Sequence, residues 1–507
     1  MTQPDPYRRF AGAASVQLDV YEAENGLRYE SLYDGGVPVA VPDHDSLSRL
    51  MYFGLALSAR KYYRDQYWSL RVNPSSGNLH SVECYLATDA LGDACLYHYA
   101  AESHALTQRA RFDDSTFARL NVGLPGGSFL LGLSYVPWRE SWKYGVRAYR
   151  YCQQDLGHAL GALRFSAALL GWRIRLLPEV TDTRTQAVMG LDRDDAWHEG
   201  EREWPALMAA VVPTSRAFDA SRWRFPDQAV PARWFGHANQ LSRTQRDWRQ
   251  IDAVASACER DQPVVADSAD PPVAEEFDFL PSPHSAHRVI RRRRSAVDMD
   301  ERATMPRRRF YQMLMRVMPS AEVSPFDVFY WRPQIQLGLL VHRVDDLSPG
   351  LYVLMRDREQ MSAMRDVMRS EFLWQTPKEC PAGLPLYQLS EGDTRQAART
   401  VCCGQAIASD GIFAAAMLGH FEPTLKQRGA SFYRNLFWEA GLIGQVLYLD
   451  AEAAGIGATG IGCYFDEMTH REFGLTGRSY VSLYHFTVGG PLEDPRLTTQ
   501  PAYADRA

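Results

Sequence analysis

The sequence predicts an α+β protein in which one kind of domain occurs twice, and three observations support this. The segment that starts at Tyr149 reappears 284 residues later, at Tyr433. A strand–loop–strand pattern precedes each copy of this segment. A polar stretch rich in proline separates the two copies. Together these features predict two similar domains joined by a linker.

The repeated segment reads as a long helix in both copies. Apolar residues recur at three- and four-residue spacing, and a glycine follows near the end. Two unrelated apolar helices are the alternative, but a match without gaps over this length rarely arises by chance. The matched pairs are Tyr149-Arg150 with Tyr433-Arg434, Asp155 with Glu439, Gly157 with Gly441, Leu163 with Leu447, Ala167 with Ala451, Gly171 with Gly455, and Gly190-Leu191 with Gly474-Leu475.

The strand–loop–strand patterns are VECYLATDALGDACLYHY, from Val82, and LGLLVHRVDDLSPGLYVL, from Leu337. Helices mixed with strands of this length are typical of an α+β sandwich. Each domain is therefore expected to contain a mixed or antiparallel sheet flanked by helices. The long helices are expected at the interface between the two domains, which would form an intramolecular pseudo-dimer.

Composition also divides the chain. Residues 232–261 are polar and predicted to be helical, and residues 267–285 are rich in Pro, Ser and acidic residues, as in a linker or wrapped extension. We therefore expect a first domain over 1–225, a partly helical linker or extension over 226–284, and a second domain over 285–507.

The overall composition excludes several classes of protein. Hydrophobic residues make up 46% of the chain and the formal net charge is −6, which argues against disorder and against nucleic-acid binding. The longest apolar run, 159–172, is interrupted by Arg164 and is too short to span a membrane. No secretory signal is apparent, and the eight cysteines include no CxxC pair or zinc pattern. A cytoplasmic, reduced setting with no bound metal is the simplest expectation.

The sharpest local motif lies between Arg71 and His80, where Pro74-Ser75-Ser76-Gly77-Asn78 precedes a predicted strand. Such a turn offers backbone N–H groups, two hydroxyls and an amide, which suit the edge of a heteroaromatic ring. An ordinary loop that enters a strand is the alternative interpretation.

Two further motifs occur in the second copy. Arg291 to Arg294 are followed by Ser295, and guanidinium groups beside a serine hydroxyl suit a phosphate; a solvated basic face is the alternative. The stretch 459–466, TGIGCYFD, is glycine-rich. The run 455–460 fits GxGxxG, but it follows a helix and leads towards a strand, so we reject a dinucleotide-binding interpretation.

These motifs resemble those of the nitroreductase superfamily. In that family a PSSxNxQP segment of one subunit and an RRSxR-like segment of the other bind FMN. This chain keeps PSSGN only in its first half and RRS only in its second, with His80, Ser81 and Val297 in place of the family's Gln, Pro and base. The resemblance implies one FMN per chain, between the halves. The FMN-binding residues it implies are Arg71, Pro74, Ser75, Ser76, Asn78, Arg293, Arg294, Ser295, Ile461, Gly462, Cys463 and Tyr464, with Arg496 as a substitute for the missing base.

The segment from Trp142 to Tyr151 narrows the comparison. It resembles the KYGERGYRY stretch of the SagB/ThcOx-type dehydrogenases, which oxidise azolines in ribosomally made peptides during natural-product biosynthesis. That resemblance implies that Lys143 and Tyr144 remove a substrate proton while hydride passes to flavin N5. The alternative is that the pair only caps a helix and packs against the loop.

Three functions therefore follow from the sequence as hypotheses. The first is an FMN-dependent dehydrogenase acting on an azoline or another small-molecule or peptide substrate derived from amino acids. The second is an NAD(P)H-dependent reductase of nitroaromatics or quinones, and the third is a degenerate flavin-binding scaffold. No nucleic-acid or membrane partner is expected, and the sequence leaves open whether the pseudo-dimer is a monomer or pairs further as a homodimer.

Overall fold

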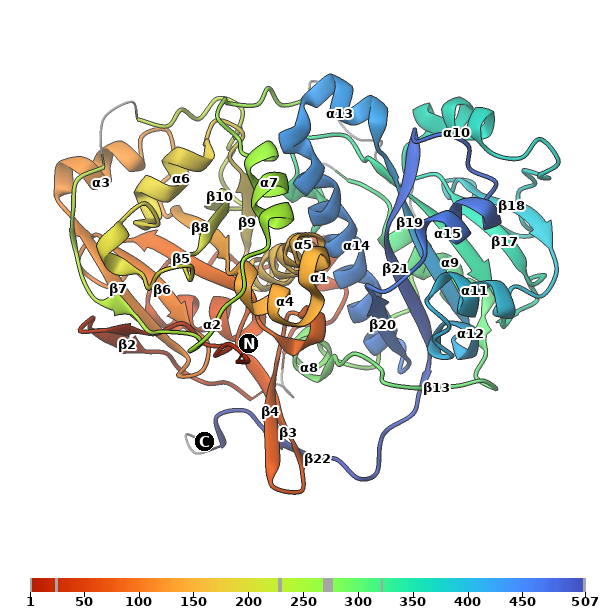
Figure 1. The fold of residues 1–507 in the computed structure, drawn as a ribbon, viewed down its shortest axis with the longest axis horizontal. Coiled ribbons are helices and arrows are strands. Elements are labelled where there is room, and N and C mark those ends of the chain that lie inside the picture. Colours follow the sequence, from red (N-terminus) through yellow and green to blue (C-terminus); the bar gives the residue numbers. More distant parts are fainter. Residues whose placement is uncertain (1, 23–25, 227–229, 268–276, 321, 505–507) are drawn as a thin grey trace.

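The computed structural model describes residues 2–22, 26–226, 230–267, 277–320 and 322–504. Figure 1 shows two α+β halves side by side, each with its own sheet, and two long helices where the halves meet. The predicted fold class, two tandem α+β sandwiches in an intramolecular pseudo-dimer, is confirmed.

The first half contains a sheet with the strand order β11-β7-β6-β5-β8-β10-β9, and β2 pairs with the outer strand β7. Its central strands are buried on both faces because helices cover the sheet, so their sequences read as nearly continuous apolar runs. The strands are β2 (Ser15–Gln17), β5 (Val82–Thr88), β6 (Cys95–Ala100), β7 (Ala105–Phe112), β8 (Phe129–Tyr135), β9 (Trp172–Leu176), β10 (Trp204–Pro213) and β11 (Ala232–Trp234).

The second half repeats this order. Its sheet runs β13-β21-β19-β15-β17-β18, with β20 also paired to β21, so β20-β21-β19-β15-β17-β18 corresponds to β9-β10-β8-β5-β6-β7. In each half the long helix connects a central strand to an edge strand. The strands are β13 (Met299–Asp300), β15 (Ile335–Val341), β17 (Gly350–Leu354), β18 (Leu386–Glu391), β19 (Phe413–His420), β20 (Gly457–Ile461) and β21 (Tyr480–Pro491).

The two repeat copies are the helices α5 (Ala148–Ala168) and α14 (Tyr433–Ala453), which pack against each other between the sheets (Figure 1). The matched glycines explain how closely they approach. A Cβ atom on Gly157 would lie 2.9 Å from Cα of Gly441, and one on Gly441 would lie 2.9 Å from Cα of Gly157. The repeat thus places glycine where the helices touch.

Matched charged residues also link the halves. Arg434 pairs with the buried Asp182 at 2.7 Å, and at the same offset Arg150 lies 3.7 Å from Asp466. The rings of Tyr149 and Tyr433 stack with centroids 6.3 Å apart at the start of the two helices. These contacts extend the pseudo-twofold relation beyond the helices themselves.

The region between the copies is less helical than predicted. Within 232–261 only α7 (Arg249–Ala257) is a helix, whereas β11 adds an edge strand to the first sheet by pairing with β7. Sheet pairing outweighs the polar composition here because residues 110–112 of β7, beyond its pairing with β2, would otherwise form an unpaired edge. Of the predicted linker 267–285, residues 268–276 lie outside the described residues. The domain boundaries themselves stay a prediction.

A hairpin of β3 (Leu57–Tyr63) and β4 (Gln66–Arg71) projects from the first half, and the C-terminal strand β22 (Thr498–Pro501) pairs with β3 (Figure 1). The chain end of the second half therefore lies on the first.

The other elements are mostly short. The short strands are β1 (Phe10–Ala11), β12 (His237–Ala238), β14 (Met305–Pro306) and β16 (Val344–Asp345). The remaining α-helices are α1 (Ser31–Asp34), α2 (His44–Gly54), α3 (Asp114–Leu120), α4 (Pro137–Tyr144), α6 (Asp182–Met189), α8 (Ala286–Arg292), α9 (Arg307–Arg316), α10 (Met361–Val367), α11 (Arg395–Val401), α12 (Ile407–Asp410), α13 (Glu422–Arg428) and α15 (Asp466–Glu472).

The structure bears on three features considered in the sequence: the GxGxxG-like run, membrane-spanning helices and metal clusters. The GxGxxG-like run 455–460 follows α14 and leads into β20, which confirms that it is not a dinucleotide-binding turn. In the described part of the chain, no helix is both long and apolar enough to cross a membrane, and no cluster of three or more His, Cys, Asp or Glu residues could hold a metal ion.

Candidate functional site

A cavity of about 440 Å³ lies between the two halves, with walls from both. Its volume is in the range typical of small-molecule and cofactor sites. Most residues singled out from the sequence line it, although they come from four separate segments of the chain. They are Arg71, Pro74, Ser75, Ser76, Asn78, Tyr144, Arg293, Arg294, Ser295, Ile461, Gly462 and Cys463.

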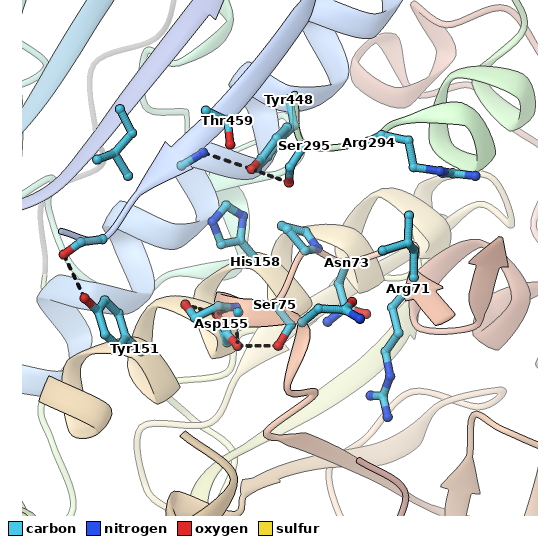
Figure 2. A pocket seen from close by; sticks show the side chains of 18 of the residues that line it. Arg71, Asn73, Ser75, Tyr151, Asp155, His158, Arg294, Ser295, Tyr448 and Thr459 are labelled. Atoms are coloured by element: carbon cyan, nitrogen blue, oxygen red, sulfur yellow. Dashed lines mark hydrogen bonds between the residues drawn. The ribbon is translucent and has the colours of Figure 1, made fainter. Parts of the chain in front are cut away.

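The PSSGN loop is held by Asp155, a buried carboxylate on α5 (Figure 2). Ser75 Oγ donates to it at 2.8 Å, and Ser76 donates through both its backbone N–H and its hydroxyl at 2.9 Å. Burial raises the pKa of Asp155 to about 6, although these hydrogen bonds act in the opposite direction. The two serine hydroxyls thus donate to Asp155, whereas the sequence suggested that they face a ligand directly.

Two neighbours of this loop present unpaired polar atoms. Arg71 donates to the carbonyl of Val82 at 3.1 Å, and its guanidinium is directed away from Ser295 (Figure 2). The side chain of Asn73 is 2% exposed and its Oδ1 has no partner among the described residues. A buried amide oxygen of this kind requires a donor. Asn73 was not predicted as a site residue, because nothing in the sequence distinguishes it except its position beside the motif.

The basic segment follows α8 and reaches the opposite side of the cavity. Arg293 is 3% exposed and donates to the backbone carbonyl of Arg71 at 3.0 Å. Arg294 donates only to backbone carbonyls, and burial together with the adjacent arginines lowers its pKa to about 9. In the described structure neither guanidinium has a carboxylate partner. The carboxylate of Glu452 acts on both electrostatically but forms no ion pair with either in the described structure, and two partly desolvated cations so placed favour an anionic ligand at this position.

Tyr448 of α14 joins the basic segment to the glycine-rich strand. Its hydroxyl shares a hydrogen bond of 2.8 Å with Ser295 Oγ and accepts one of 2.9 Å from the backbone N–H of Gly460 (Figure 2). Beside it, His158 Nε2 lies 3.1 Å from the hydroxyl of Tyr484. Burial lowers the pKa of His158 to about 3, so its ring is neutral.

The glycines of β20 permit close packing of aromatic rings at the cavity wall. A Cβ atom on Gly460 would lie 1.9 Å from the hydroxyl of Tyr484, and one on Gly462 would lie 2.3 Å from the ring of Tyr151. Tyr151 also donates to the carbonyl of Gly462 at 3.0 Å. Any side chain at either position would therefore displace the wall.

The next two residues face opposite ways. Cys463 is exposed and lines the cavity. Tyr464 is buried with its ring stacked on His485, at 4.5 Å between centroids. Of the four residues of this stretch that the resemblance implied for FMN binding, Ile461, Gly462 and Cys463 line the cavity, whereas the side chain of Tyr464 belongs to the core.

Lys143 and Tyr144 end α4 beside the PSSGN loop. A Cβ atom on Gly77 would lie 2.5 Å from the hydroxyl of Tyr144 and 3.1 Å from Nζ of Lys143. Tyr144 lines the cavity, whereas Lys143 is exposed at its edge. Burial raises the pKa of Tyr144, so its hydroxyl stays protonated and suits donation better than proton abstraction. The sequence did not indicate Asp155 as a base, yet its side chain supplies the carboxylate among the residues that line the cavity.

Arg496, suggested as a substitute phosphate contact, is not brought to the cavity. Its guanidinium pairs with the carboxylate of Asp494 at 2.7 Å, and its side chain is largely exposed. The guanidinium is held by this ion pair with a residue of the same turn. The adjacent Leu497 lines the cavity instead.

The position related to this cavity by the repeat is filled by side chains. Arg164 and Arg175 stand 284 residues before Tyr448 and Thr459. Both contact Asp327: Arg164 Nε and Nη2 donate to its carboxylate at 2.8 and 2.9 Å, and Arg175 donates to its backbone carbonyl. A buried ion pair thus occupies the mirror position.

Comparisons with known proteins agree with this fold. Residues 350–490 match the protein-family model described as Nitroreductase family. A search of curated proteins found no match. The solved structure of a candidate nitroreductase from Anabaena variabilis has a TM-score of 0.67 at 18% identity and covers 97% of this chain and 94% of its own.

Two further solved structures share less with the chain. A candidate nitroreductase from Exiguobacterium sibiricum in complex with FMN has a TM-score of 0.25 at 12% identity, covering 44% of this chain and 91% of its own. An E. coli microcin synthetase complex has a TM-score of 0.30 at 17% identity, covering 50% of this chain and 85% of its own. Likenesses this weak carry no argument here. Residues 350–490 thus match the Nitroreductase family model, within a chain that has, over nearly its whole length, the fold of the Anabaena protein.

Proposed function

We propose that the cavity binds one FMN and that the chain is an FMN-dependent oxidoreductase. One observation carries the proposal: the PSSGN loop of the first half and the Arg293-Arg294-Ser295 segment of the second half line a single cavity. Because each half supplies only one of the two elements, a complete site arises once per chain.

The residues present fit such a ligand. The phosphate would lie at Arg293, Arg294 and Ser295, where neither guanidinium forms an ion pair with a carboxylate of the described residues. The ring system would lie between the PSSGN loop and Gly460, with Asn73 Oδ1 left to accept a hydrogen bond from it. A bound flavin would supply the capacity to accept or release two electrons.

Within that activity, we propose a dehydrogenase acting on an azoline or another amino-acid-derived compound. Loss of hydrogen from such a substrate requires a proton acceptor, and Lys143 lies with Tyr144 at the edge of the cavity. The protonated Tyr144 hydroxyl can orient the substrate, while Lys143 or the Asp155 carboxylate removes the proton. The buried aromatic wall, including Tyr484, excludes water from the interior side.

The test measures cofactor content and turnover in the same preparation. Cofactor released by denaturation is identified and counted; the proposal expects FMN at one per chain. Oxidation of azoline peptides and reduction of quinones by NAD(P)H are then compared. A stoichiometry of two, or FAD, would contradict the single composite site, and rapid NAD(P)H-driven reduction without azoline oxidation would replace the dehydrogenase with a reductase.

A further inference from the structure

Two cysteines that are sixty residues apart in the sequence meet at the rim of the cavity. Sγ of Cys463 lies 2.7 Å from Sγ of Cys403. Cys463 is in the connection between β20 and α15, and Cys403 is in the connection between α11 and α12. A covalent disulfide has an S–S distance of about 2.05 Å, so a movement of less than about 1 Å would join them.

The surroundings give the two sulfurs different roles. Cys463 is exposed and lines the cavity, and Nη1 of Arg147 lies 3.9 Å from its sulfur. A positive charge beside an exposed sulfur is typical of cysteines that attack disulfides. Cys403 is half-buried behind it, and burial raises the pKa of its thiol to about 12, with the neighbouring Cys463 adding to the effect.

The other cysteines lack this arrangement. Cys402, adjacent in sequence, is buried and its Sγ lies 3.5 Å from Nδ1 of His485. Cys380 is half-buried like Cys403, but its Sγ donates to the carbonyl of Leu384 at 3.5 Å. Among the described residues, Cys403 and Cys463 are thus the pair with both sulfur contact and access to solvent.

We propose that Cys403 and Cys463 form a reversible disulfide by exchange with a small-molecule disulfide. The Cys463 thiolate attacks one sulfur of that compound, which breaks its S–S bond and releases one thiol. Cys403, after losing its proton to solvent, attacks the Cys463 sulfur and displaces the second thiol. The protein loses two thiols, one external disulfide becomes two thiols, and the charges balance.

The disulfide would connect two segments of the cavity wall. Gln405 already donates from one segment to the backbone carbonyl of Cys463 at 3.2 Å and to that of Cys402 at 2.9 Å. Oxidation would add a covalent link between the same two segments beside the cavity. The inference concerns the protein's own thiols and stands whether or not a flavin is bound.

The experiment uses the full chain equilibrated in buffers with increasing ratios of oxidised to reduced glutathione. Free thiols are blocked by alkylation, and peptides are analysed without reduction. We expect two thiols lost per chain and a linked peptide whose fragments assign the bond to Cys403 and Cys463. Cys380→Ser should behave as the wild type. Cys403→Ser should instead hold glutathione on Cys463, and Cys463→Ser should lose no thiol.

Three outcomes would overturn the proposal. They are a bond between Cys402 and Cys403, retention of every thiol at the most oxidising ratio, and loss of two thiols in the Cys463→Ser variant. Repeating the titration on protein stripped of cofactor separates this result from the proposed flavin site, because disulfide formation does not require the flavin.

Discussion

Replacing Arg293 by Ala tests where the anionic end of the ligand lies. Arg293 is almost fully buried, lines the cavity and has no carboxylate partner in the described structure. A charge-assisted hydrogen bond contributes roughly 1.5–3 kcal/mol, which corresponds to an increase in the Kd for FMN of about 10- to 150-fold. The control, Arg308→Ala, removes an exposed guanidinium that pairs with Asp278, and a change below about 0.5 kcal/mol is expected.

The assay is titration of cofactor-free protein with FMN and with riboflavin, which lacks the phosphate, followed by quenching of flavin fluorescence. Arg293 also donates to the carbonyl of Arg71, so its loss can disturb the fold. Such a disturbance weakens both ligands, whereas loss of a phosphate contact weakens only FMN. The ratio of the Kd for riboflavin to the Kd for FMN should therefore fall in Arg293→Ala and stay constant in Arg308→Ala. An unchanged ratio would show that Arg293 does not bind the phosphate.

Three further changes test other parts of the structure. Gly441→Ala forces a Cβ atom to within 2.2 Å of the carbonyl of Gln154, so thermal or denaturant unfolding should show a loss of about 1–3 kcal/mol, whereas Gly126→Ala, with no atom within 4 Å, should be neutral. The pKa of Asp155 is raised from 3.8 to about 6, so its contribution to stability is complete below about pH 4 and is lost as the pH rises through 6. Between pH 4 and 7 the free energy of unfolding of the wild type should fall by about 2.4 kcal/mol relative to Asp155→Asn, and parallel pH profiles would refute this. The double change Lys143→Ala with Tyr144→Phe should preserve FMN binding and lower azoline oxidation by about 10²- to 10⁴-fold; full activity in that variant would remove both residues from the mechanism.

The features predicted correctly from the sequence are those that local patterns carry. Helical periodicity and the 284-residue offset predicted α5 and α14. Both signals are strong because the two helices bury nearly every side chain and keep glycine where they touch. The strand–loop–strand patterns correspond to β5–β6 and β15–β17. The polar stretch after residue 231 was the exception, since its short strand forms only because a neighbouring sheet edge is available.

The residues missed in the site are those whose importance depends on tertiary contacts. Asp155 appeared in the sequence only as the repeat partner of Glu439, yet it holds the PSSGN loop through three donors from Ser75 and Ser76. Tyr448 lies within an apolar helix, where nothing in its local pattern indicates a bond to Ser295. Conversely, Arg496 has the right charge but forms an ion pair within its own turn, which charge alone does not reveal.

The two repeat-matched carboxylates show how the halves diverged. Asp155 accepts hydrogen bonds from the PSSGN loop, and Glu439 accepts them from the backbone N–H groups of Gln334 and Ile335, in the second-half segment that occupies the corresponding place. The same anchoring is thus kept in both halves, although the loops that it anchors differ. On the opposite wall, Arg164 replaces Tyr448 and binds Asp327.

Random decay would be expected to damage both positions independently. Here, by contrast, one position keeps a cavity lined by two arginines that form no ion pair with a carboxylate of the described residues, and the other is closed by a buried bidentate ion pair that crosses between the halves. Breaking a buried pair of this kind costs about 3–5 kcal/mol, because it leaves an uncompensated charge. The closed position therefore contributes to holding the halves together, which keeps the walls of the open cavity in register. The asymmetry of the sequence then follows from a division of labour: one interface position keeps the cavity that we propose as the ligand site, and its mirror position fixes the geometry.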